Sequence, residues 1–110
     1  MMDAITGEFD TGEDEQPRTL DIDIDVTFQK KRFTTLHLEE PTGKQLERAE
    51  LELNQVNQTP YTIRRYQIML IAQVAHVPRE VVLELRESEI MRAFDFLEQR
   101  RRDSQATGAT

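Results

Sequence analysis

The sequence predicts an α+β fold in which an N-terminal two-stranded antiparallel β-hairpin is followed by a small bundle of three to four helices. Apolar and polar residues alternate strictly from Leu20 to Phe28, which is the pattern of a half-buried strand. A short basic turn and a second alternating segment follow. Beyond Pro41, apolar residues recur at helical spacing. The 110 residues leave room for one domain.

The hairpin is expected over residues 20–40, with a register that keeps its apolar residues on one face. A three-residue loop, Gln29–Lys31, places Ile24 opposite Leu36. A slip of one residue would turn an apolar face to water, so this register is favoured. The other pairs that it predicts are Ile22 with Leu38, Phe33 with Thr27 on the polar face, Asp23 with His37, and a repulsive pair of Asp21 with Glu39.

Helices are expected at about residues 42–56, 62–75, 78–85 and 88–101. Thr42 can cap the first and Ser88 the last. His76 is expected in the left-handed conformation that ends the second, where glycine is more usual. The stripes expected to be buried are Leu46, Ala49, Leu53 and Val56 in the first helix, Ile63, Tyr66, Leu70, Ile71 and Val74 in the second, and Ile90, Ala93, Phe94 and Leu97 in the last.

Both ends of the chain are expected to be disordered. Residues 1–19 hold six acidic side chains and one arginine without an apolar period, and residues 103–110 form a short polar tail. The single domain is therefore residues 20–102. Its roughly eighty residues form a core that supplies only ~3–5 kcal/mol. A homo-oligomer or a binding partner is expected for this reason.

No catalytic, cofactor-binding or metal-binding residues are predicted, and the protein is expected not to be an enzyme. The chain has no cysteine, and neither His37 nor His76 has a second histidine at i+3 or i+4. Ser88 is a candidate cap and Ser104 lies in the tail, so neither suits a nucleophile. Residues 42–44 resemble the end of a phosphate loop, but the required upstream glycine is missing.

The composition favours a soluble cytoplasmic protein that binds neither membrane nor nucleic acid. No apolar run approaches the ~20 residues of a membrane span, and the start of the chain lacks the regions of a signal peptide. The net charge of −7 opposes non-specific nucleic-acid binding. The basic clusters are instead expected at a charged hairpin tip, a solvated helix face and a helix C-terminus.

Four apolar residues lie about 100–180° away from the main stripes of their helices. Two interpretations remain open. These side chains meet the hairpin or a second helix layer inside the same monomer, or they form a surface that binds a partner. The four candidates for partner binding are Leu51, Ile68, Met69 and Phe96.

Several segments occur in an order that resembles one family. The hairpin runs into Leu38–Gly43, and a helix ends in Ile71–Pro78 before Val81–Leu85. Glu89 then precedes the apolar helix 90–97. From about residue 20 to 97 the chain resembles the tail assembly chaperones of Mu-like contractile-tailed phages. It departs from the family in the hairpin turn, at Lys30–Lys31, and at the helix end, at His76, where the family often has glycine.

The resemblance implies a non-enzymatic chaperone that acts in the cytoplasm of the infected host and is absent from the mature virion. It implies that the protein binds the tape measure protein, keeps it soluble and helps the tail tube assemble around it. The tail tube protein and a frameshift-extended form of the chain itself are further partners that the family suggests. The alternatives are a small structural adaptor that stays in the particle, and a small regulator that binds nucleic acid through its arginines.

Overall fold

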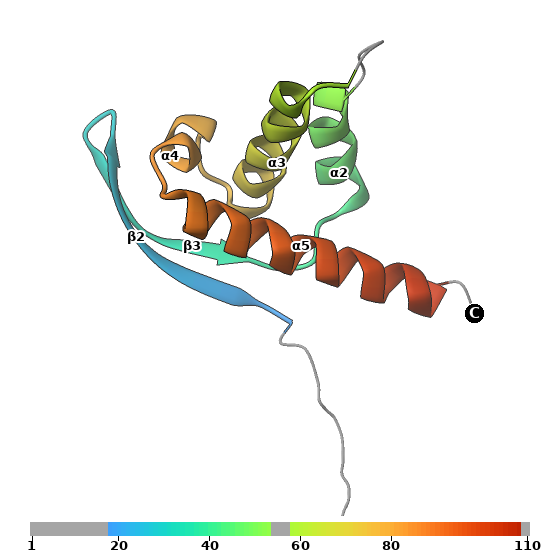
Figure 1. Ribbon diagram of the computed structural model, residues 1–110. Helices are drawn as coiled ribbons and strands as arrows, with labels where there is room; N and C mark the ends of the chain where they lie inside the picture. The colour runs from blue at the N-terminus through green and yellow to red at the C-terminus, as the bar shows by residue number, and fades with distance from the viewer. Residues whose placement is uncertain (1–17, 54–57, 109–110) are drawn as a thin grey trace, which may run out of the picture.

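The computed structural model describes residues 18–53 and 58–108, and it confirms the α+β class. Figure 1 shows a curved hairpin with the helices gathered on its concave side and α5 running along it. The elements in chain order are β2 (Leu20–Phe28), β3 (Lys31–Leu38), α2 (Gly43–Glu50), the 3-10 helix η1 (Leu51–Leu53), α3 (Pro60–Ala75), α4 (Arg79–Leu83) and α5 (Glu87–Gly108).

One hydrophobic core lies between the hairpin and the helices, and α3 is at its centre. α3 contacts α2, α4, α5 and β3, whereas β2 contacts α4 and α5. The ring of Tyr66 on α3 meets Phe94 on α5 edge to face, with 5.9 Å between ring centroids. Edge-to-face contact stabilises an aromatic pair by more than the burial of its apolar area alone. The buried residues of α3 are Tyr66, Ile68, Leu70, Ile71, Ala72 and Val74.

The faces of the hairpin are as predicted, but its register is not. The loop has two residues, Gln29 and Lys30, with φ angles of 52° and 67°. Two positive φ angles are the requirement of the type I′ turn, whose twist matches that of a hairpin. This turn and a β-bulge in β2 together place Leu36 opposite Ile22 and not opposite Ile24. For the pairs made by Leu20–Asp23 this is a shift of two residues, which leaves these side chains on the faces that the alternation predicts.

A β-bulge in β2 explains the other differences between the predicted and the observed pairs. The register shifts between Asp23 and Val26, so two residues of β2 oppose Thr34 alone. The shift places Phe33 opposite Val26, where it packs against the core, so its prediction on the polar face beside Thr27 is wrong. The other corrected pairs are Asp21 with His37, in place of Asp21 with Glu39, and Asp23 with Thr35, in place of Asp23 with His37.

The first two helices begin at capping boxes. Thr42 accepts a hydrogen bond from the N–H of Gln45 at 3.1 Å, as its predicted role requires. α3 begins at Pro60, earlier than the expected residue 62, because Thr59 accepts from the N–H of Thr62 at 3.2 Å. α2 gives way to η1 at residue 51, and Val56 of the predicted stripe lies outside the described residues.

The ends of the later helices agree with prediction in part. His76 ends α3 with a φ of 57°, the predicted left-handed conformation. α4 is shorter than the predicted 78–85. α5 begins at Glu87, so Ser88 lies within its first turn and is not the cap; the carboxylate of Glu89 instead accepts from the N–H of Arg86 at 2.8 Å. α5 extends to Gly108, beyond the expected end and into the predicted tail.

Candidate partner-binding surface

A hollow of about 450 Å³ lies between the end of α2 and the middle of α3. Leu51, the first residue of η1, lines this hollow and is 63% exposed. Met69 of α3 is half-buried at the opposite wall. The residues that define this α2–α3 hollow are Arg48, Leu51, Glu52, Met69 and Gln73. Apolar side chains with charged neighbours at the rim are the usual composition of a small binding groove.

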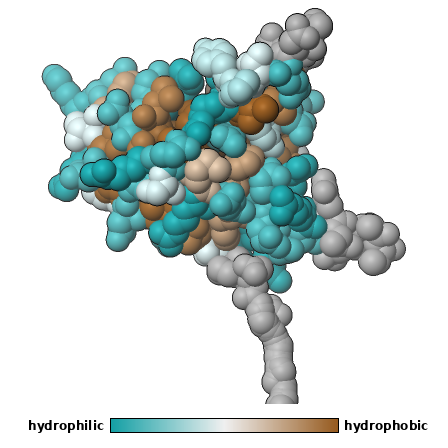
Figure 2. Space-filling model, in the orientation of Figure 1, coloured by the Kyte–Doolittle hydropathy of each residue, from teal (hydrophilic) through white to brown (hydrophobic). Residues whose placement is uncertain are grey.

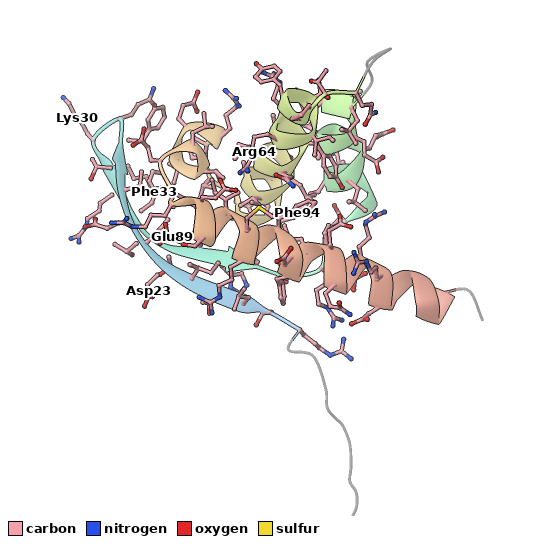
Figure 3. The ribbon with its side chains drawn as sticks, viewed as in Figure 1. Asp23, Lys30, Phe33, Arg64, Glu89 and Phe94 are labelled. Carbon is pink, nitrogen blue, oxygen red and sulfur yellow. The ribbon has the colours of Figure 1, made fainter. Side chains whose placement is uncertain are left out.

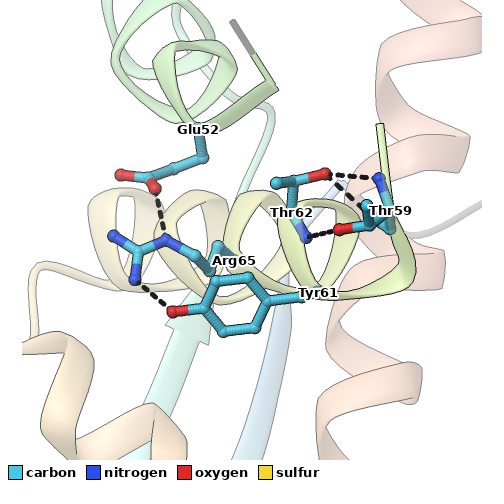
Figure 4. A network of polar contacts seen from close by, with 5 residues as sticks. All are labelled: Glu52, Thr59, Tyr61, Thr62 and Arg65. Atoms are coloured by element: carbon cyan, nitrogen blue, oxygen red, sulfur yellow. Dashed lines mark hydrogen bonds and ion pairs between the residues drawn. The ribbon is translucent and has the colours of Figure 1, made fainter. Parts of the chain in front are cut away.

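A polar network holds the rim of the hollow in place (Figure 4). The Nε of Arg65 donates to the carboxylate of Glu52 at 2.7 Å, and a guanidinium nitrogen donates to the hydroxyl of Tyr61 at 3.0 Å. The same guanidinium lies 5.5 Å from the centroid of the Tyr61 ring, a cation–π distance. The hydrogen bond that Arg65 donates to Glu52, followed by the one that it donates to Tyr61, raises the pKa of Arg65. The network joins η1 to the first turns of α3.

The structure separates the four residues that the sequence grouped as partner-binding candidates. Leu51 and Met69 line the same hollow. Ile68 is only 2% exposed and belongs to the core, so its side chain is not available at the surface. Phe96 is half-buried and packs against the core from α5, and it does not line the hollow. For Ile68, the monomer-interior interpretation is the correct one.

Sequence reasoning missed two exposed apolar residues at the start of α3. Tyr61 is 66% exposed and is held by Arg65 beside the hollow. Ile63 was predicted to be buried but is 44% exposed. The available signal was Pro60: with the helix beginning there, Tyr61, Arg65 and Met69 follow at intervals of four and share one helical face. The exposed surface of α3 is therefore richer in apolar groups than predicted.

Apolar side chains reach the surface in separate patches. Figure 2 shows brown patches interrupted by hydrophilic residues across the visible face. Leu83 on α4 is a further exposed residue, at 48%, and it lies outside the α2–α3 hollow. Scattered exposed apolar residues are normal on a protein surface, so the α2–α3 hollow is distinguished by the convergence of Leu51 and Met69 and not by exposure alone.

The described residues offer no metal site and no membrane span. Within residues 18–53 and 58–108, no three His, Cys, Asp or Glu side chains are grouped to hold a metal ion. Across the same ranges, no helix combines the length and the apolar character that a bilayer crossing requires. His37 instead forms a hydrogen bond with Asp21 at 2.6 Å on the exposed face of the hairpin.

Comparison with protein families identifies the family of this chain. The family model for phage tail assembly chaperone proteins, E, or 41 or 14, matches residues 19–99. This range includes the hairpin, α2, α3, α4 and most of α5. The chain therefore belongs to the phage tail assembly chaperone family. No curated protein and no solved structure matches it.

Proposed function

We propose that this chaperone is non-enzymatic and binds an amphipathic helix of the tape measure protein in the α2–α3 hollow. The observation that carries the proposal is the convergence of Leu51 and Met69 on one hollow with a charged rim. A helix that is apolar along one side can place a side chain between them, while its polar flanks meet Arg48 and Glu52. The flexible thioether of Met69 suits varied apolar partners.

In this proposal the chaperone covers apolar segments of the tape measure protein in the host cytoplasm and leaves before the tail is complete. The tail tube protein and a frameshift-extended form of the chain are further proposed partners. The family membership supports an assembly role, and the exposed Leu51 supports a binding role for this part of the surface. A chaperone that leaves is absent from purified virions, which mass spectrometry tests directly. Detection in proportion to tail proteins would instead favour the structural adaptor.

Co-expression with the tape measure protein of the same phage, followed by a pull-down, tests the hollow. Leu51→Glu places a charge at an exposed apolar wall, so we expect a folded protein that captures at least about tenfold less client. Met69→Glu is expected to act in the same direction. Leu83→Glu is the matched control, because Leu83 is also an exposed leucine but lies on α4. Circular dichroism checks that each variant remains folded.

Two outcomes of the pull-down would contradict the assignment of the hollow. Capture at wild-type yield by folded Leu51→Glu and Met69→Glu would exclude it as the client site. Equal losses in Leu51→Glu and Leu83→Glu would show that any exposed apolar residue contributes, without a defined groove. Failure of the wild-type protein to capture the client would contradict the tape measure protein as partner.

A further inference from the structure

The outer edge of β2 is the second surface of the molecule with features of a binding site. In the described part of the chain the sheet has two strands, so β2 pairs with β3 on one side only. The free side of an edge strand presents unpaired N–H and C=O groups that can pair with another strand. A two-stranded sheet is also marginally stable alone, so a third strand would stabilise it.

A groove runs along this edge between β2 and the helices. It consists of two hollows of about 520 and 350 Å³, which share Asp25, Val26 and Glu84. Consecutive residues of β2 from 23 to 28 line it, so it follows the strand edge and not one face of the sheet. Its opposite wall is formed by Glu80, Glu84, Leu85, Arg86 and Glu89. We call this feature the β2-edge groove.

The β2-edge groove is acidic at its rim. Three of its carboxylates, those of Asp23, Glu80 and Glu84, form no ion pair or hydrogen bond with another described residue. Asp25 is neutralised by Arg32 at 3.1 Å, and Arg86 is the cation on the helical wall. Figure 3 shows Asp23 on the hairpin and Glu89 at the start of α5. A strand that enters the groove should therefore carry positive charge.

The same chain carries a segment with this charge. Gln29 and Lys30 form the tip of the hairpin, followed directly by Lys31 and Arg32. Figure 3 shows Lys30 at the projecting end of the hairpin, away from the helices. Lys30 makes no ion pair with a described residue, and Lys31 lies over the ring of Phe33 at 5.2 Å. The tip is thus exposed and available to a second molecule.

The pattern of aspartates in β2 selects one way of pairing two edges. An antiparallel pairing of two β2 strands centred on Asp25 would place two carboxylates directly opposite each other, which is unfavourable. A pairing centred on Thr27 avoids this contact. It places Phe28 of the second copy opposite Val26, and the Gln29–Lys30 turn that follows Phe28 then lies beside the Asp23–Asp25 part of the first strand. It also uses the end of β2 beyond the bulge, where the strand is regular.

We propose that two copies of this chain associate through the β2 edges, each placing its Lys30–Lys31 tip in the β2-edge groove of the other. The contact is isologous, so every tip–groove interaction forms twice, as a two-fold dimer requires. The acidic segment 1–17 is a poor occupant because its charge has the same sign as the groove. This dimer does not depend on the α2–α3 hollow or on the tape measure protein.

Sedimentation velocity of the full chain and its charge variants tests the dimer. The wild-type protein should sediment as a concentration-dependent dimer. The tip variant Lys30→Glu with Lys31→Glu, and the groove variant Asp23→Lys with Glu84→Lys, should each raise the dissociation constant at least about tenfold, because like charges then face each other. Lys44→Glu with Arg102→Glu is the matched control, since both positions are exposed and lie outside the groove.

Mixing the two variants gives the sharpest result. The tip variant has an acidic tip and an acidic groove, whereas the groove variant has a basic tip and a basic groove. A mixture should therefore form a heterodimer although each variant alone is monomeric. Restored association would show that the loss in each variant did not come from misfolding. A monomeric wild type at its highest soluble concentration, or a mixture that stays monomeric, would overturn the proposal.

Discussion

The hairpin and α3 show two different relations between sequence and structure. α3 makes its hydrogen bonds within itself, so its spacing and its caps fix where each side chain points. β2 and β3 must find each other across a turn, and the type I′ turn and the bulge decide which residues meet. Helical phase is therefore a local property, whereas strand register is not.

A second difference concerns how many sides of each element are covered. β2 buries one face and exposes the other: Ile22, Ile24 and Val26 are buried, and the aspartates between them are exposed. α3 buries Ile68 as well as the predicted stripe apart from Ile63, because α2, α4, α5 and β3 all contact it. A central helix is apolar around most of its circumference. Of the off-stripe apolar residues, Ile68 of α3 thus belongs to the core, whereas Met69 of α3 and Leu51 of η1 line the α2–α3 hollow.

The largest expected effect tests the one-sided burial of β2. Ile24→Asp would place a charge at a site that is 8% exposed, and the desolvation cost of several kcal/mol approaches the whole stability of a domain this size. We expect the variant to be unfolded by circular dichroism. Asp23→Ile, one residue away on the exposed face, should fold. An unfolded Asp23→Ile beside a folded Ile24→Asp would reverse the faces.

A smaller effect is expected from the second side of α3. Ile68→Ala removes a side chain that is 2% exposed, and such truncations cost ~2–5 kcal/mol in the free energy of unfolding. Leu51→Ala is the control, since this residue is 63% exposed and surface changes stay within about 0.5 kcal/mol. Urea denaturation measures both. Equal costs would show that Ile68 is not a core residue.

Local chemistry explains what could be predicted from the sequence. Thr42 caps α2 and His76 adopts the left-handed conformation, as their side chains and neighbours indicated. Ser88 was predicted to be a cap on the same grounds, but α5 already begins at Glu87, and Glu89 accepts a hydrogen bond from the N–H of Arg86. A two-residue turn made by Gln29 and Lys30 gave no sequence signal, since type I′ turns favour asparagine and glycine.

The candidate binding surface was predictable only in part. The angular positions of Leu51 and Met69 around their helices identified them, because both lie away from the apolar stripes. Such positions do not show which other helices or strands pack against a residue. They therefore could not distinguish Ile68, which other helices cover, from Leu51, which they leave exposed. The β2-edge groove was beyond prediction, because it joins a strand edge to residues 80–89, far away in the sequence.

The smallest expected effect on stability concerns Asp21 and His37, which the bulge places opposite each other on the exposed face of the hairpin. Asp21 accepts a hydrogen bond from His37 at 2.6 Å, and this contact, opposed by partial desolvation and aided by the charges of Asp21 and Glu39, raises the pKa of His37. Because the pKa is raised in the folded state, the pair stabilises the fold fully below the unfolded value of about 6.5. This stabilisation is lost as the pH rises through the folded pKa.

Asp21→Asn should lower the pKa of His37 toward its ordinary value, measured by an NMR titration of the imidazole protons. Asp23→Asn is the control, since Asp23 lies opposite Thr35 and should leave the titration of His37 unchanged. The unfolding midpoint should shift little, because both partners are more than half exposed and water screens their attraction. If Asp23→Asn lowered the pKa while Asp21→Asn did not, the original register with Asp23 opposite His37 would be correct and the bulge would not exist.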